Sequence, residues 1–296
     1  MLQNHPAGAG NLLGWVAIQH SATEERGSFN ILDLSTRENI THVLPGRPGF
    51  FAETTRPGVI LVGLERRLAF YNYLEGTLAE TGTSVSDNPR VIINDGLAVE
   101  GGVFFGTKHL DFNQPVAALY FFDISSRQLI EVAPAQTCSN GKLFLPDADG
   151  ATLIDTDTTP KEISRYRLDR SRRKILSKSL LIEPRALPAY PDGLRPTPDG
   201  GGILVAFYNP EAVTDGLARR YDLADGGASQ DWVIPGSPRV TCPEFIEFDG
   251  GIKVLFTTAV EGMPQSIRKH APGAGSMYIA DTPFEHLPPF PPLLSI

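Results

Sequence analysis

The feature that most constrains the fold is a short segment that recurs six times along the chain. Each copy is an apolar or aromatic stretch whose last residue is an aspartate or an asparagine. The copies span residues 29–33, 68–72, 119–123, 164–169, 218–222 and 276–281. Their last residues lie 39 (33 to 72), 51 (72 to 123), 46 (123 to 169), 53 (169 to 222) and 59 (222 to 281) positions apart. A period of about 40–50 residues is typical of β-propeller blades, each a small sheet of four strands.

The rest of the chain is consistent with a repeated β structure. Most apolar segments are short, alternating or β-branched, and Gly, Pro, Asn or Asp residues bound them, whereas helical periodicity is scarce. The 29 glycines and 25 prolines also indicate many turns. We therefore predict an all-β fold, a six-bladed β-propeller, formed as one domain over residues 1–296. The N-terminal segment is expected to complete the last blade, and the proline-rich stretch 286–292 to be a surface strap rather than a helix or a central strand.

Composition narrows the range of partners. A formal net charge of −8 argues against a nucleic-acid-binding protein, and no run of 18 or more apolar residues predicts a membrane span. The first residues show no basic end followed by an apolar block, so we expect no secretory signal and a cytoplasmic location. Two cysteines, Cys138 and Cys242, are expected to be reduced thiols, and Cys138 is either a small buried side chain or a neighbour of the site. The expected partner is a small-molecule substrate.

Three polar turns stand at a spacing of one blade. Asn94, Asn140 and Asp192 lie 46 (94 to 140) and 52 (140 to 192) residues apart, and a glycine follows each within two residues. A second turn comes about six residues later each time, so each polar residue precedes a short strand of its own. Equivalent positions in neighbouring blades meet near the propeller axis, where two amides and one carboxylate suit a hard cation such as Ca²⁺, Mg²⁺ or Mn²⁺. The alternative is that all three are ordinary turn residues.

The chain resembles the regucalcin/senescence marker protein–gluconolactonase–luciferin-regenerating enzyme family. The matching stretches occur in the family's order over most of the chain. They are Asn94-Asp95-Gly96 leading to Gly106-Thr107, Ser139-Asn140-Gly141 leading to Asp155-Thr156-Asp157, Pro191-Asp192-Gly193-Leu194 leading to Phe207-Tyr208-Asn209, and Pro243 through Leu255-Phe256-Thr257-Thr258 to Tyr278.

The resemblance implies a metal site. In the family one divalent ion, here Ca, Mg, Mn or Zn, is held by a glutamate of the first blade, an asparagine and an aspartate. Asn140 and Asp192 match the last two, and Asn94 matches a second asparagine close to the ion. The family's glutamate has no counterpart, because the turn before the strand at 13–18 reads Gln3-Asn4-His5-Pro6. Asn4 or His5 could take its place as a ligand, and the alternative is an ordinary turn.

Two further positions bear on the substrate. The arginine that many sugar-lactonase members carry two residues before their asparagine is Ile92 here, so a contact with a sugar acid is expected to be missing. The family's substrate lid corresponds to residues 107–115. Within it Lys108, His109 and Asp111 are candidate substrate contacts, the alternative being a solvated loop.

The function that the resemblance implies is a metal-dependent, lactonase-like hydrolase acting on carboxylic ester bonds. A cation on Asn140 and Asp192 would polarise the carbonyl of a lactone or similar ester and acidify a water molecule. Asp192 would act as the base, and Asn94 would donate a hydrogen bond to the oxyanion. The alternatives are a different metal-assisted reaction in the same pocket, such as hydrolysis of another ester or phosphoester or an isomerase or lyase step, and a non-catalytic propeller that binds a small ligand.

Overall fold

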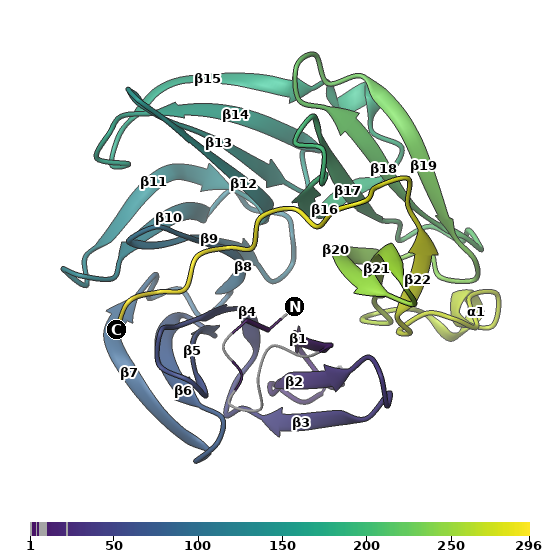
Figure 1. Cartoon of the computed structure of the whole chain (residues 1–296), viewed down its shortest axis with the longest axis horizontal. Helices are drawn as coiled ribbons and strands as arrows, with labels where there is room; N and C mark the ends of the chain where they lie inside the picture. Colours follow the sequence, from purple (N-terminus) through teal and green to yellow (C-terminus); the bar gives the residue numbers. More distant parts are fainter. Residues whose placement is uncertain (1, 4, 6–10, 22) are drawn as a thin grey trace. The chain divides into compact units, whose positions relative to one another are not determined.

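The computed structural model describes residues 2, 3, 5, 11–21 and 23–296. Strands form nearly all of its regular structure, and its described part has a single short α-helix, α1 (Gln265–Arg268), and one 3₁₀ turn (Pro184–Ala186). The strands make six small sheets of three or four members, drawn in Figure 1. The predicted all-β fold, a six-bladed β-propeller, is confirmed.

The structure divides into two compact units, which we describe separately. The first holds the described residues up to Ser139 together with Pro291–Ile296. Its first sheet contains β1 (Leu12–Ala17), β2 (Ser28–Asp33) and β3 (Asn39–Val43). Its second contains β4 (Pro48–Glu53), β5 (Val59–Leu64), β6 (Arg67–Asn72) and β7 (Thr77–Ser84). Its third contains β8 (Val91–Val99), β9 (Gly102–His109), β10 (Ala117–Asp123) and β11 (Leu129–Gln136).

The second unit spans Asn140–Phe290 and also has three sheets. The first contains β12 (Ser139–Asp147), β13 (Gly150–Asp157), β14 (Glu162–Leu168) and β15 (Ile175–Ile182). The next contains β16 (Tyr190–Pro196), β17 (Gly202–Tyr208), β18 (Gly216–Asp222) and β19 (Ala228–Ile234). The last contains β20 (Val240–Phe248), β21 (Gly251–Thr258) and β22 (Tyr278–Asp281). The expectation of one domain over 1–296 stays a prediction.

The six repeated segments of the sequence fall on β2, β6, β10, β14, β18 and β22, one strand in each sheet. The polar residue at or just after the strand end closes the turn that follows by accepting backbone hydrogen bonds. Asp33 Oδ1 accepts from the N–H groups of Ser35 at 2.7 Å and Thr36 at 3.2 Å. Asn72, Asp123, Asp169 and Asp222 do the same in their own turns. Asn and Asp side chains favour such turns, which explains why the repeat ends on them.

Each unit has its own apolar core. In the first unit Phe50, Leu61 and Phe105 are buried together between the β4–β7 and β8–β11 sheets. In the second unit Ile154, Val205 and Tyr221 belong to one core cluster, and Phe245 and Val254 belong to another. The alternation of buried and exposed residues along the strands follows the two-residue period of side chains in a sheet.

The C-terminal segment is anchored in the core of the first unit by Leu294. Residues 286–292 are neither helix nor strand, as predicted from their prolines. Leu294 then forms a parallel bridge with Thr54, and only 1% of its surface is exposed. The expected surface strap therefore ends on a buried anchor. The N-terminal segment is described only in part, and its strand β1 pairs with β2 in the first sheet, so the expected closure of the last blade by this segment stays a prediction.

The first strand of several sheets carries one extra residue at the same place. The register shifts by one residue relative to the neighbouring strand at Gly49 in β4, Asn94 in β8, Asp192-Gly193 in β16 and Thr241 in β20. Such β-bulges redirect a side chain and are common next to functional sites. Gly49 is needed at its bulge, because a Cβ atom there would lie 2.5 Å from the carbonyl oxygen of Ile93.

Candidate functional site

Two of the three predicted turn residues lie at these bulges, and all three lie within strands. Asn94 is inside β8, Asn140 inside β12 and Asp192 inside β16. The predicted turn geometry is therefore wrong. The extra residue in the strand, rather than a hairpin turn, accommodates the polar side chain at Asn94 and Asp192. The second turns were predicted correctly, since residues 100–101, 148–149 and 197–201 connect consecutive strands.

Asn94 is a buried residue of the first unit, and its amide nitrogen already has a hydrogen-bond acceptor. Its Nδ2 donates to the carbonyl oxygen of Ser139 at 3.0 Å and contacts Sγ of Cys138 at 3.6 Å. Its Oδ1 has no hydrogen-bond partner among the residues that the structure describes. An amide held in this way presents an oxygen, so the geometry does not favour the predicted role of Asn94 as a hydrogen-bond donor to an oxyanion. Cys138 is both buried and adjacent to this residue, so both interpretations of it hold.

The predicted lid begins as a strand. Lys108 and His109 are the last residues of β9, and they are 5% and 2% exposed, so neither belongs to a solvated loop. The exposed loop comprises residues 111–116. Asp111 lies in it and forms an ion pair with Arg90. The buried strand end, rather than the loop, therefore carries the two basic candidates.

Lys108 is a buried cation that lacks a carboxylate partner. Its Nζ lies 5.5 Å from the centre of the Phe112 ring. No Asp or Glu oxygen of the described residues lies within 4.0 Å of Nζ, and no described residue forms a hydrogen bond with it. The backbone of Lys108 pairs with Ile92 in β8 and forms a bridge with Cys138. It therefore lies one strand away from the segment that carries Asn94.

In the second unit a hydrogen-bond chain links Asn140 to the residue before Asp192. Asn140 Nδ2 donates to Thr158 Oγ1 at 3.0 Å, and Thr158 Oγ1 donates to the carbonyl oxygen of Pro191 at 2.8 Å. Thr158 follows directly after β13. Since the nitrogen of a planar amide faces Thr158, the oxygen of Asn140 faces away from it. The structure thus brings Asn140 and Asp192 together.

Close packing of the two backbones also brings the segments of Asn140 and Asp192 together. A Cβ atom on Gly141 would lie 2.3 Å from the backbone nitrogen of Leu194 and 2.8 Å from the carbonyl oxygen of Asp192. Only glycine allows β12 and β16 to approach so closely. The glycine after Asn140, predicted as part of a turn, is therefore a packing residue.

A buried ion pair lies behind Asn140. Lys142 Nζ and Asp155 Oδ1 are 3.2 Å apart, and their side chains are 1% and 0% exposed. The Lys142 ammonium also donates to the backbone oxygen of Asn140. Removing one member of such a pair leaves the other charge buried and uncompensated, so the pair fixes this part of β12 firmly.

Arg239 and Tyr208 lie beside Asp192. The Arg239 guanidinium stacks on the Tyr208 ring at 5.1 Å, and the backbones of the two residues form a bridge. Tyr208 pairs on its other side with Tyr190, two residues before Asp192. Burial raises the pKa of the Tyr208 phenol to about 12; the Arg239 charge lowers it, while the Glu261 and Asp192 charges raise it. The phenol is therefore protonated at neutral pH.

The arginine is a second buried cation without a carboxylate. It is 3% exposed, its guanidinium donates to the backbone oxygen of Glu261, and its Nε has no hydrogen-bond partner among the described residues. In the part of the chain that the structure describes, no carboxylate oxygen lies within 4.0 Å of it.

The structure does not place His5 beside Asn94. The His5 ring stacks on Tyr73, with centres 5.9 Å apart and planes 8° apart. Tyr73 follows the end of β6, whereas Asn94 lies against Gly49 near the beginning of β4, at the opposite end of the same sheet. We therefore do not include His5 in the site that we propose. Asn4, the other predicted substitute for the family's glutamate, lies outside the described residues.

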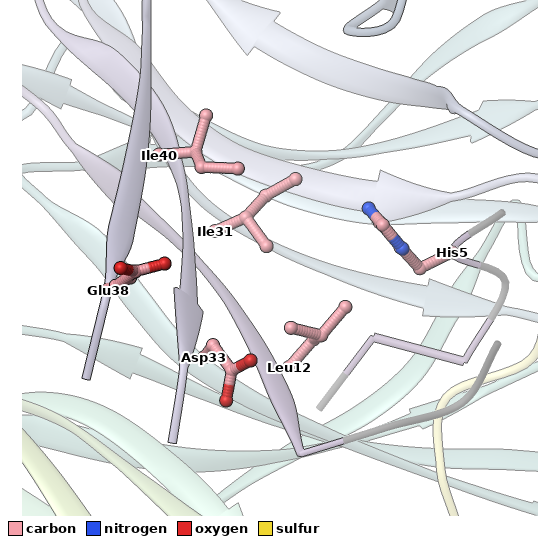
Figure 2. A pocket seen from close by; sticks show the side chains of 6 residues that line it. All are labelled: His5, Leu12, Ile31, Asp33, Glu38 and Ile40. Atoms are coloured by element: carbon pink, nitrogen blue, oxygen red, sulfur yellow. The ribbon is translucent and has the colours of Figure 1, made fainter. Parts of the chain in front are cut away.

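His5 lines a small pocket of the first sheet instead. The pocket has a volume of about 130 Å³ and is lined by His5, Leu12, Ile31, Asp33, Glu38 and Ile40. Figure 2 shows His5 on one side of it and Glu38 on the other. Among the described residues no group of three or more His, Cys, Asp or Glu side chains could hold a metal ion, in this pocket or elsewhere.

A hard cation fits the oxygen donors of the second unit. Amide and carboxylate oxygens are what Ca²⁺, Mg²⁺ and Mn²⁺ prefer, and Asn140 with Asp192 supplies one of each. The amide of Asn140 already has its nitrogen bound to Thr158, which orients its oxygen. These two residues are the ones that could hold the ion.

Sequence reasoning missed three residues of this neighbourhood. Thr241 occupies the bulge of β20 and its Oγ1 lies 2.7 Å from that of Thr257. Its distance of 49 residues from Asp192 (192 to 241) equals one blade and could have identified it. Thr158 and Arg239 carry no such signal, because neither stands at the repeated position.

Comparison with known protein families identifies the family of this chain. The model of the SMP-30/gluconolactonase/LRE-like region matches residues 9–259. The chain belongs to this family, as its motifs predicted.

Individual relatives agree with this assignment. The chain is 27% identical to an L-arabinolactonase of Azospirillum brasilense over 252 residues, which cover 81% of this chain and 76% of the relative. Its fold is similar to that of regucalcin from Agrobacterium tumefaciens, described as a calcium-binding protein, with a TM-score of 0.79 and 21% identity over 96% of this chain and 90% of that one. A luciferin-regenerating enzyme has a TM-score of 0.72 and 17% identity, covering 96% of this chain and 98% of that one.

No helix within the described ranges has the length and apolar character needed to cross a membrane.

Proposed function

We propose that this protein is a lactone hydrolase that uses one divalent cation held by Asn140 and Asp192. The observation that carries the proposal is the hydrogen-bond chain from Asn140 through Thr158 to Pro191, which sets an amide oxygen next to the strand segment bearing Asp192. Family membership and the L-arabinolactonase relative support the reaction type. The regucalcin relative, described as calcium-binding, supports the cation.

In this proposal the chain's own residues position the cation and move one proton. A divalent cation, when bound, supplies Lewis-acid polarisation of the lactone carbonyl and acidifies water. Asn140 contributes a neutral oxygen, oriented by Thr158. Asp192 contributes a carboxylate that accepts a proton from the attacking water and returns it to the alkoxide that leaves when the ring opens. No serine or cysteine nucleophile is required.

The other candidate residues lie in the first unit and have no part in the reaction proposed for the second. Asn94 and Lys108 are buried polar residues on neighbouring strands there, and their role as substrate contacts stays a prediction. His109 is buried at the end of β9, and Asp111 is engaged by Arg90, so we give them no role.

The test is hydrolysis of a panel of sugar lactones by the metal-stripped protein reconstituted with Ca²⁺, Mg²⁺, Mn²⁺ or Zn²⁺. Asp192→Ala is expected to reduce kcat/KM by at least ~100-fold, since it removes both a ligand and the base. Asp231→Ala is the matched control, because Asp231 is an exposed carboxylate of the same unit that pairs with Arg219. No hydrolysis by the wild type with any of the four metals, or full activity of Asp192→Ala, would contradict the proposal. Metal and ligand binding without turnover would favour a non-catalytic binding protein.

A further inference from the structure

Three consecutive sheets of the second unit each carry an oxygen-bearing side chain near the start of their first strand. Asn140 is the second residue of β12, Asp192 the third of β16 and Thr241 the second of β20. They lie 52 (140 to 192) and 49 (192 to 241) residues apart, one blade each time. Asp192 and Thr241 both lie at bulges of their strands. Thr241 therefore continues a series whose first two members are the proposed metal ligands.

The backbones of these three strands are in close contact at the same places. A Cβ atom on Gly141 would lie 2.8 Å from the carbonyl oxygen of Asp192. A Cβ atom on Gly193 would lie 2.6 Å from the carbonyl oxygen of Thr241. Each of these glycines directly follows a proposed ligand, and each allows its strand to touch the next one. Thr241 is therefore adjacent to the bulge that carries Asp192.

The hydroxyl of Thr241 presents lone pairs, because its proton already has an acceptor. Thr241 Oγ1 and Thr257 Oγ1 are 2.7 Å apart, and the Thr257 hydroxyl donates to the carbonyl oxygen of Cys242 at 3.3 Å. A hydroxyl has one proton, so Thr257 is the acceptor between the two threonines and Thr241 is the donor. No N–H or O–H group of the described residues donates to Thr241 Oγ1. Since Thr241 is partly exposed, an ion can reach this oxygen.

A hard divalent cation needs more oxygen ligands than Asn140 and Asp192 supply. Ca²⁺ takes about six to eight oxygen ligands and Mg²⁺ about six. One amide and one carboxylate leave most of these positions to other oxygens. The hydroxyl of a serine or threonine is a ligand that proteins use for Mg²⁺.

We propose that Thr241 is a third protein ligand of the cation, bound through its Oγ1. The inference rests on the cation binding of the proposed function and extends its ligand set, with residues of the second unit alone. The two neutral ligands are then prepared in the same way. Thr158 accepts from the amide nitrogen of Asn140, which leaves the amide oxygen for the ion. Thr257 accepts the proton of Thr241, which leaves the hydroxyl oxygen.

The experiment is titration calorimetry of the metal-stripped protein with Ca²⁺ and Mn²⁺, without any substrate. Thr241→Val keeps the shape but removes the oxygen, and the dissociation constant should rise about tenfold. Thr241→Ser keeps the hydroxyl and should stay within about threefold of the wild type. Thr241→Asp adds a carboxylate and should lower the dissociation constant for Ca²⁺ by about tenfold, because charged ligands strengthen Ca²⁺ binding.

Thr152→Val is the matched control, since Thr152 is a partly exposed threonine of β13 at the opposite end of that strand from Thr158. It should leave the dissociation constant unchanged. The melting temperature of each metal-free variant shows whether that variant is folded. An unchanged dissociation constant in Thr241→Val would overturn the inference, and so would weaker Ca²⁺ binding by a folded Thr241→Asp. If Thr241→Val does not fold without metal, Thr241→Asp decides.

Separate measurements distinguish this inference from the proposed function. Cation binding that is lost in Asp192→Ala but unaffected in Thr241→Val would leave the proposed site standing and overturn its extension to Thr241. Cation binding that weakens in Thr241→Val, with no hydrolysis of any lactone by the wild type, would reject the hydrolase and support Thr241 as a ligand. A wild type that binds none of the cations would overturn both.

Discussion

Thr158 is the single residue on which the geometry around Asn140 and Asp192 depends most. Its hydroxyl accepts from Asn140 Nδ2 and donates to the carbonyl oxygen of Pro191, so one oxygen atom sets the orientation of the amide and the position of the neighbouring segment. A side chain without this hydroxyl leaves the amide free to rotate, and an amide that presents its nitrogen cannot bind a cation.

Replacing this threonine is therefore expected to weaken metal binding before it affects anything else. Thr158→Val keeps the shape but removes the hydroxyl, and we expect the dissociation constant for Mn²⁺ or Ca²⁺, measured by titration calorimetry, to rise about tenfold. Thr158→Ser should restore binding. Thr159→Val, in the same turn, is the control. Unchanged affinity in Thr158→Val would show that Thr158 does not position Asn140.

Which residues of the site were predictable depends on whether they share the repeat. Asn94, Asn140 and Asp192 were found because they stand at equivalent places one blade apart. Contacts between strands bring three other residues close to Asn140 or Asp192, namely Thr158, Tyr208 and Arg239. The sequence shows no pattern that predicts such contacts. His5 stacks on Tyr73 in the first unit, and its predicted role as a metal ligand stays a prediction.

At the scale of the elements, strands were predicted well and turns less well. The recurring apolar or aromatic stretch that ends in aspartate or asparagine identified one strand of every sheet. The Asn-Gly and Asp-Gly pairs were assigned to turns because both residues tolerate positive φ. In β16 the Asp192-Gly193 pair lies at a bulge instead, and in β8 the bulge falls on Asn94, directly before the Asp95-Gly96 pair. Turn and bulge favour the same residues, so sequence alone does not separate them.

The C-terminal segment is an element whose contribution can be measured. Leu294 is 1% exposed and packs in the core of the first unit, whereas Ile296, two residues on, is 50% exposed. We expect Leu294→Ala to lower the free energy of unfolding by about 2–4 kcal/mol, because it leaves a cavity in a packed core.

Ile296→Ala, the matched control, should change the free energy of unfolding by less than about 0.5 kcal/mol. Urea denaturation followed by tryptophan fluorescence measures both variants. Equal effects of the two substitutions would mean that the segment is not anchored at Leu294.

For the molecule as a whole, the buried tyrosines predict how stability depends on alkaline pH. Burial raises the pKa of five phenols from 10.0 to about 12; they are Tyr73, Tyr120, Tyr166, Tyr208 and Tyr221. Between these two values the unfolded chain loses protons that the folded chain keeps. Stability is therefore fully present below pH 10 and is lost as the pH rises toward 12, by up to about 1.4 kcal/mol per pH unit for each tyrosine.

Tyr221 offers the cleanest test of this dependence. Its side chain is 1% exposed, its hydroxyl donates to the carbonyl oxygen of Ala186, and the neighbouring charges of Arg219 and Asp231 act on it in opposite directions. Between pH 10 and 11.5 the unfolding free energy of the wild type falls as the pH rises. In Tyr221→Phe the slope of this fall should be smaller by nearly the contribution of one proton, about 1.4 kcal/mol per pH unit, as measured by urea denaturation at several pH values. An unchanged slope would contradict the assignment.

The fold class could be predicted because the blades of a propeller repeat in the sequence, here as one strand per sheet that ends at or next to an aspartate or asparagine. The grouping of the described structure into two compact units did not follow, because no composition shift or linker separates residues 139 and 140.

The extra residue in the first strand of several sheets has an evolutionary consequence. Because an inserted residue takes no part in the ladder of hydrogen bonds, its side chain can be exchanged without disturbing strand pairing where there is room for it, as there is not at Gly49. The chain holds asparagine, aspartate and threonine at three other such places. A scaffold of this kind can acquire a new ligand set or a new substrate through point substitutions alone, while the sheets that carry it stay the same.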